Sequence, residues 1–239
     1  MTSLQTAAGS LKRHRSGQAL RLVALPAGLV AATWLTVHAL MHVHASATPP
    51  WTLARASGIT GYGLLTLMVC LGLLLAHPTV RRRQAHRLVS QIRVHTHLAV
   101  FTLAFLALHV AALASDPWAH VGWAGVLLPM ASHYRPVPVT LGVLAVWSGL
   151  LTGLSAALAG RWFGALWWPV HRLALLAFVL AWTHGLWAGS DSPALLALYL
   201  VSGAAVLALA LSRYRARTAT DLRVEQAAPQ APRSRRNLP

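Results

Sequence analysis

The chain has 239 residues, of which 56% are hydrophobic and only 10% are charged, and its formal net charge is +16 at pH 7. A soluble domain of this size carries roughly 25% charged residues, so the composition excludes an ordinary soluble protein and indicates a membrane protein. The single cysteine, Cys70, excludes an intrachain disulfide, an iron–sulfur cluster and a thiolate zinc site.

Apolar segments long enough to cross a membrane occur six times along the chain. About 20 apolar residues in a helix span ~30 Å of hydrocarbon. The sequence therefore predicts an all-α membrane protein, a bundle of six transmembrane helices. In chain order the expected spans are 20–41, 56–76, 95–114, 137–159, 171–188 and 194–211.

Three regions follow from these spans. Residues 1–19 form a basic tail that lacks the short apolar core and small-residue cleavage site of a signal peptide, so the first span is expected to be retained. Residues 20–212 form the transmembrane domain. Residues 213–239 contain Pro, Gln, Ala and Arg with few large apolar side chains, and we expect this basic tail to be disordered.

The basic residues are distributed unequally between the two sides of the predicted bundle. This bias places both termini of the multi-pass protein in the cytoplasm, with Arg55 and Arg135 on the outer side. It explains the positive charge by topology and contact with membrane lipids, so no nucleic-acid partner is expected. The 18 lysines and arginines on the cytoplasmic side are Lys12, Arg13, Arg15, Arg21, Arg81, Arg82, Arg83, Arg87, Arg93, Arg161, Arg172, Arg213, Arg215, Arg217, Arg223, Arg233, Arg235 and Arg236.

Four histidines lie inside the third and fifth spans, His95 and His109 separated by 14 residues and His171 and His184 by 13. An imidazole in hydrocarbon must be hydrogen-bonded, face water or ligate something. Both spans run outward from the cytoplasm, which pairs His95 with His171 on the inner side and His109 with His184 on the outer side. The separations of ~21 Å and ~19.5 Å along the helices leave room for two haems on separate levels.

Helical phase refines this prediction. The 14 residues between the histidines of the third span bring the second side chain within ~40° of the helix face of the first, whereas the 13 residues in the fifth span place it ~140° away. The fifth helix therefore needs a tilt, a local bulge or haems approached from different angles. His97 lies two residues from His95 and is the alternative ligand of the third span. We favour His95 because its phase matches that of His109.

The histidine-bearing segments resemble a known family. The fifth span contains RWFGALWWPVHRL at 161–173 and THGLW at 183–187, and three further segments agree, LARA at 53–56, YRP at 134–136 and TLG at 140–142. Together with the two histidine spacings, these segments resemble the ferric reductase-like transmembrane family. That family includes the haem-binding membrane subunit of the bacterial periplasmic methionine sulfoxide reductase system and the membrane domain of NADPH oxidases and ferric reductases.

The resemblance implies a dihaem b-type cytochrome, a multi-pass protein that carries electrons across the bacterial plasma (inner) membrane. His95 and His171 would ligate the iron of an inner haem b, and His109 and His184 that of an outer one. The donor would be a cytoplasmic flavin reductase or quinol, and the acceptor a periplasmic or extracellular reductase, ferric iron or oxygen. The chain has no glycine-rich fingerprint and no phosphate loop, so no flavin or nicotinamide site is expected. It would therefore be an electron-transfer subunit of an oxidoreductase, without catalytic residues of its own.

Two further sites are weaker candidates. The resemblance places Arg55 near haem propionates, although an arginine at a membrane boundary also anchors to headgroups. His38 and His42 have i, i+4 spacing at the outer end of the first span, next to His44, and could bind a metal ion, a quinone or another acceptor. The alternative is that these histidines are ordinary interface residues.

Two alternatives to the dihaem hypothesis stay open. A metal or proton transporter would also place histidines inside a bundle, but such proteins usually carry carboxylates in their spans. All four acids of this chain lie outside the predicted spans, at Asp116, Asp191, Asp221 and Glu225. A cytochrome b membrane anchor of another oxidoreductase would share the haem but use a different set of ligand-bearing helices.

Overall fold

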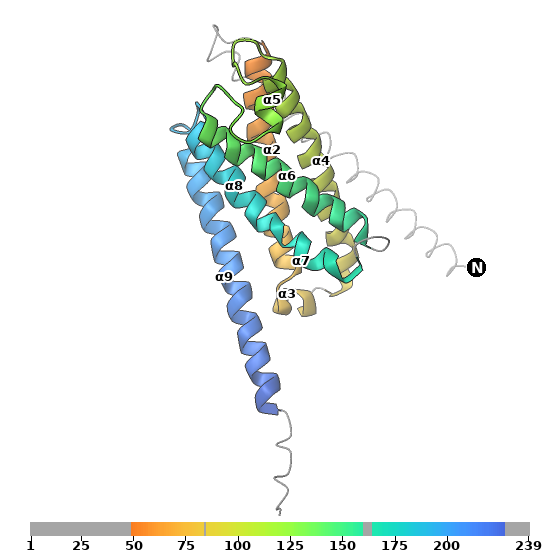
Figure 1. Cartoon of the computed structure of the whole chain (residues 1–239). Coiled ribbons are helices and arrows are strands. Elements are labelled where there is room, and N and C mark those ends of the chain that lie inside the picture. Colours follow the sequence, from red (N-terminus) through yellow and green to blue (C-terminus); the bar gives the residue numbers. More distant parts are fainter. Residues whose placement is uncertain (1–48, 84, 160–163, 228–239) are drawn as a thin grey trace, which may run out of the picture. The chain divides into compact units, whose positions relative to one another are not determined.

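The computed structural model describes residues 49–83, 85–159 and 164–227, and all regular elements in this part of the chain are helices (Figure 1). Five helical segments are long and apolar enough to span a membrane, with mean hydropathies from 1.4 to 2.2. By helix length and hydropathy, the chain is an all-α, multi-pass membrane protein. The five segments are Pro49–Leu75, Leu88–Ser115, Pro136–Ala157, Gly164–Ala188 and Leu196–Ala219.

These segments confirm the last five of the six predicted spans, while the predicted first span, 20–41, lies outside the described residues. Helix α2 (Pro49–Leu75) and helix α4 (Leu88–Ser115) both begin seven residues before the predicted spans at 56 and 95. Hydropathy detects only the apolar part of a helix, and polar residues at its water-facing end remain helical because their backbone groups still need partners.

Helix α9 (Leu196–Ala227) differs from the sequence-based expectation at its C-terminal end. The structure has helix through Ala227, where disorder was expected from residue 213 onward. Arg, Ala, Leu, Gln and Glu fill ten of the fifteen positions from 213 to 227, and all five are good helix formers, although the stretch as a whole is too polar to form a packed core. Low hydropathy therefore predicted the end of the apolar span and not the end of the helix.

Proline marks the start of several helices because it lacks an N–H that the first helical turn would leave unpaired. Helices α2, α3 (Pro78–Arg83) and α6 (Pro136–Ala157) all begin with proline. The remaining elements are η1 (Ala85–Arg87), α5 (Gly122–Leu127), η3 (Gly164–Leu166), α7 (Trp167–His171) and α8 (Leu173–Ala188).

The chain divides into two compact units, and the boundaries between them fall inside α2, α4 and α6. In its described part, unit 1 consists of residues 49–63 and 102–143. Unit 2 consists of residues 64–83, 85–101, 144–159 and 164–227.

Unit 1 has a small apolar core formed by the loop that follows α4 and by the residues packed against it. Ala119, Val121 and Val126 are buried there, and the partly buried Trp51 of α2 packs against them. The Trp51 ring meets the Trp118 ring edge to face, with centroids 5.9 Å apart. These contacts hold the loop between α4 and α6 against the first turn of α2.

Unit 2 is held together in part by close packing of α8 against α9. The indole Nε1 of Trp182 donates a 2.8 Å hydrogen bond to the carbonyl oxygen of Tyr199. Glycine allows this approach, because a Cβ at Gly203 would lie 3.1 Å from the Trp182 Nε1, and one at Gly185 would lie 2.6 Å from the Tyr199 hydroxyl oxygen. Helix α3 also contacts α9 in this unit. Large apolar side chains such as Val201 and Leu207 are more than half exposed on the surface of α9, as expected for helices that face lipid.

Candidate functional site

The rings of His95 and His171 lie close together within unit 2, in an edge-to-face arrangement. Their ring centroids are 6.2 Å apart and their planes meet at 70°. His95 projects from α4 and His171 is the last residue of α7, and both side chains are half-buried. The Nδ1 atom of each ring is buried and has no hydrogen-bond partner among the described residues. A buried nitrogen without a partner costs about 1–3 kcal/mol, so each of the two rings can take a further partner at this site.

The spacing of the two rings fits a metal held between them. With each metal–nitrogen bond at about 2.0 Å, two opposed imidazole ligands have ring centres roughly 6 Å apart. The described residues contain no group of three or more His, Cys, Asp and Glu side chains that could hold a bare metal ion. Two opposed imidazoles leave four further positions on a six-coordinate iron, and a porphyrin supplies four. The pair therefore fits an axially ligated haem better than a bare ion held by the described side chains.

Two tryptophans stand beside His171. The Trp168 ring is stacked on the His171 ring at 6.5 Å with an interplanar angle of 23°, and the Trp167 ring lies at 5.8 Å. The short segment that carries all three residues begins after η3 and ends at Arg172. Aromatic contact on this side limits rotation of the imidazole and keeps it directed toward His95.

Helix α2 provides the space that His95 occupies. A Cβ at Gly72 would lie 3.2 Å from Cε1 of His95, which is closer than ordinary van der Waals contact. The sequence analysis did not single out Gly72 as a site residue. Its only sequence signal is its spacing from another glycine of the same helix.

In unit 1, His109 is oriented by the backbone of α2. Its Nδ1 donates a 2.7 Å hydrogen bond to the carbonyl oxygen of Ala54. A neutral imidazole that donates from Nδ1 carries its lone pair on Nε2, and metal-ligating histidines are usually oriented by a hydrogen bond of this kind. A Cβ at Gly58 would lie 2.8 Å from the His109 Nδ1, so the ring can approach α2 only where the chain has glycine.

The two glycine contacts have the same interval as the two histidines. Gly58 faces His109 and Gly72 faces His95, and both the glycines and the histidines are 14 residues apart. Fourteen residues are close to four helical turns, so each pair lies near one face of its helix. Each histidine of α4 thus packs against a glycine of α2, and the equal intervals indicate that the two glycines make room for the two imidazole rings.

His184, the fourth predicted ligand, lies half-buried on α8 in unit 2, whereas His109 lies in unit 1. The pairing of His109 with His184 stays a prediction. Between His171 and His184 the helix is interrupted, because α7 ends at His171 and α8 begins at Leu173. At this point the Leu175 N–H donates a 3.3 Å hydrogen bond to the carbonyl of Arg172, three residues earlier, as in a 3-10 helix and not four residues earlier as in an α-helix. A local irregularity in this helix was one of the three possibilities that the phase mismatch between the two histidines left open.

The other predicted site residues are placed as follows. His97 is exposed, and its Nδ1 donates to the carbonyl oxygen of Arg93 at 2.7 Å, within its own helix. Arg55 is half-buried on α2 in unit 1. His38, His42 and His44 lie outside the described residues.

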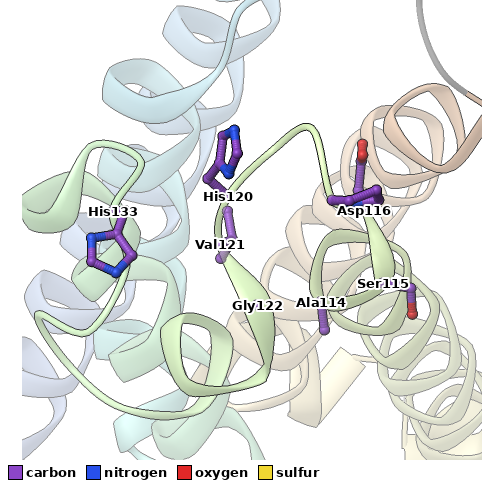
Figure 2. Close-up of a pocket in the computed structure, with 8 residues that line it drawn as sticks. Ala114, Ser115, Asp116, His120, Val121, Gly122 and His133 are labelled. Carbon is purple, nitrogen blue, oxygen red and sulfur yellow. The ribbon is translucent and has the colours of Figure 1, made fainter.

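An open pocket of about 410 Å³ lies in unit 1, at the loop that follows α4. His120 and His133 reach it from different parts of the loop, and Asp116 lies at the end of α4 (Figure 2). The Asp116 carboxylate is buried and accepts a 2.9 Å hydrogen bond from the backbone N–H of Trp118, so it stabilises the turn. These three side chains do not come together as a metal site.

Comparisons of the chain with models of protein families, with curated proteins and with solved structures give no match.

Proposed function

We propose that the chain is a b-type cytochrome of the ferric reductase-like kind that carries electrons across the bacterial plasma membrane. The observation that carries this proposal is the opposed pair of His95 and His171. Their ring separation of 6.2 Å fits two axial ligands of one iron.

The chain's own residues would hold and orient two haem b groups. His95 and His171 would ligate one, and His109 and His184 the other. Trp168 restrains the His171 ring, and the Ala54 carbonyl restrains the His109 ring. Bound haem b would supply one-electron oxidation and reduction, and the apolar helices around the ligands would exclude water and tune its potential.

The resemblance suggests partners on both sides of the membrane. A cytoplasmic flavin reductase or membrane quinol would be the donor, and a periplasmic or extracellular reductase, ferric iron or oxygen the acceptor. The transporter alternative has less support, because Asp116 and Asp191 follow the C-terminal ends of α4 and α8 instead of lying within the apolar helices. We therefore propose an electron-transfer subunit that works with a separate reductase.

Haem analysis of the purified protein tests the proposal. The full chain, expressed with ample haem, should give a dithionite-reduced b-type spectrum and two haems per chain in a pyridine haemochromogen assay. His95→Ala and His171→Ala should each remove about one haem per chain. The matched control is His97→Ala, on the same helix as His95 and exposed, which should retain both. Colourless wild-type protein, or full haem content in both ligand variants, would contradict the proposal.

A further inference from the structure

The planes of the His95 and His171 rings cross at 70°, so the two imidazoles are nearly perpendicular to each other. When an imidazole turns about its own iron–nitrogen bond, the length of that bond does not change. Coordination of one iron by both rings therefore does not by itself fix the angle between their planes. The groups that surround the two ligands must set it.

The plane of His171 is held by Trp168. The two residues are three positions apart in α7, so their side chains lie near one face of the helix. Their rings are stacked, with centroids 6.5 Å apart and planes only 23° from parallel. Offset stacking is a favoured arrangement of two aromatic rings. A turn of the imidazole out of its present plane would therefore break a favourable contact.

Trp167 supports this stacked pair from the side. Its ring lies 5.3 Å from the Trp168 ring at an angle of 71°, and 5.8 Å from the His171 ring. The next residue in this short helix, Pro169, has a fixed φ and leaves the backbone between the two tryptophans and the histidine little freedom. The His171 ring thus meets an aromatic neighbour on two sides.

The plane of His95 is held separately, by α2. A Cβ at Gly72 would lie 3.2 Å from Cε1, 3.8 Å from Nδ1 and 4.0 Å from Nε2 of His95. Three atoms of the ring therefore pack against this position of α2, and a turn of the ring would press one of its edges into the helix. Each imidazole is restrained by its own neighbours, so the crossing angle is a property of the folded chain.

A crossing of this size has an electronic consequence for an iron that both rings ligate. The π electrons of an imidazole interact with the iron d orbital that points out of the plane of that ring. Parallel rings act on one d orbital and separate it in energy from its partner, whereas perpendicular rings act on two orbitals and leave them close in energy. Low-spin ferric iron has one electron fewer in these orbitals than ferrous iron, so their separation stabilises the ferric state. Perpendicular rings lack this effect and favour the ferrous state.

We propose that Trp168, supported by Trp167, is a positioning residue that holds the plane of His171 nearly perpendicular to that of His95 and so raises the midpoint potential of the haem that these histidines ligate. This role rests on the proposed function, since it is exerted on a bound haem. Trp168 acts through the imidazole and does not ligate the iron. A raised potential makes this haem a better acceptor of electrons, which suits its predicted position next to the cytoplasmic donor.

Electron paramagnetic resonance of the oxidised full chain reports the crossing angle. A low-spin ferric haem with perpendicular imidazoles gives a strongly anisotropic signal with one line at low field, whereas parallel imidazoles give three resolved lines. The line that belongs to this haem is the one that disappears in His95→Ala. Trp168→Leu should retain two haems per chain, move this line to higher field and lower the midpoint potential of the same haem. Trp168→Phe keeps a ring for stacking and should leave both close to wild type.

The matched control is Trp147→Leu, the same change at a tryptophan of α6 that is 51% exposed and belongs to the same unit. It should alter neither the line nor the potential. An equal shift in this control, an equal shift in Trp168→Phe, or no shift in Trp168→Leu would overturn the role of Trp168. If Trp168→Leu loses this haem, Trp167→Leu gives the test, because it removes only the support from the side. The line should then move in the same direction by a smaller amount, and an unchanged line would overturn the proposal.

The spectrum of the wild-type protein separates this inference from the proposed function. Three resolved lines from the haem of His95 and His171 would overturn the perpendicular arrangement and leave the cytochrome assignment intact. Wild-type protein without haem would overturn the cytochrome assignment itself.

Discussion

The carbonyl oxygen of Ala54 accepts a 2.7 Å hydrogen bond from Nδ1 of His109, 55 residues further along the chain. The contact sets the tautomer of the ring and directs its Nε2 away from α2. Ala54 is almost fully buried, so water does not compete for the bond. In consequence, the geometry of a predicted iron ligand on α4 is controlled by the backbone of α2, and changes in α2 should be felt at the ligand.

Replacement of Gly58 by alanine should disturb this ligand. The new methyl group would lie 2.8 Å from Nδ1 of His109, which forces the ring to move and breaks its bond to Ala54. We expect Gly58→Ala to lower the free energy of unfolding by about 1–3 kcal/mol, as overpacking does, and to reduce haem content toward one per chain. Gly63→Ala is the control, because its Cβ meets nothing within 4 Å. Equal haem content and stability of the two variants would contradict this role of Gly58.

Replacement of Gly72 should have a milder effect than replacement of Gly58. A Cβ there would lie 3.2 Å from Cε1 of His95, so the ring needs to shift by only a few tenths of an ångström. We expect Gly72→Ala to retain haem but to change the midpoint potential of one haem, because the ligand orientation changes. Redox titration followed by visible absorbance measures this. A potential identical to that of wild type would show that the close approach has no influence on the ligand.

The hydrogen bond between α8 and α9 offers a test of packing that is independent of haem. Trp182→Phe removes the indole donor to the Tyr199 carbonyl, which keeps a 3.1 Å hydrogen bond from Ser202. We expect a loss of about 0.5–1.5 kcal/mol, observed as a fall of a few degrees in the thermal midpoint of the solubilised protein. The exposed Trp123 on α5 supplies the control Trp123→Phe, which should leave the midpoint unchanged. A fall of equal size in both variants would count against this bond.

Membrane orientation can be measured with cysteines introduced into a Cys70→Ala background. The excess of arginine on one side predicts that Arg82→Cys and Arg215→Cys face the cytoplasm and that Trp123→Cys and His133→Cys face outward. A membrane-impermeant maleimide should label the latter two in intact spheroplasts and the former two only after permeabilisation. The reverse pattern would invert the predicted topology.

Much of the architecture is predictable because it follows from hydropathy alone. The five described spans coincide with apolar segments, which must be helical in lipid to satisfy their backbone groups. The helix starts at Pro49 and Leu88, and the continuation of α9 to Ala227, do not follow from hydropathy. These ends lie in water-facing sequence, where helix propensity and local contacts decide.

The histidines of the candidate site can be predicted from the sequence, whereas the groups that position them cannot. The spacing of the histidines within apolar segments identifies His95 and His171 as candidates, and the structure places their two rings 6.2 Å apart. Gly72 and the Ala54 carbonyl have no chemical signal in a single sequence, since one lacks a side chain and the other acts through its backbone. A local bulge between His171 and His184 was one of the three possibilities that helical phase left open, and the position of the interruption at Arg172 does not follow from the sequence.

The paired intervals on α2 and α4 also provide a signature for detecting distant relatives. Two glycines 14 residues apart in one apolar segment, followed in the next by two histidines at the same interval, form a pattern of four positions that a genome scan can use when overall similarity has faded. Each glycine is tied to one histidine, so a homologue that has lost one histidine should be released from the need for the corresponding glycine. Divergent sequences would thus reveal which of the two glycine–histidine contacts each lineage has kept.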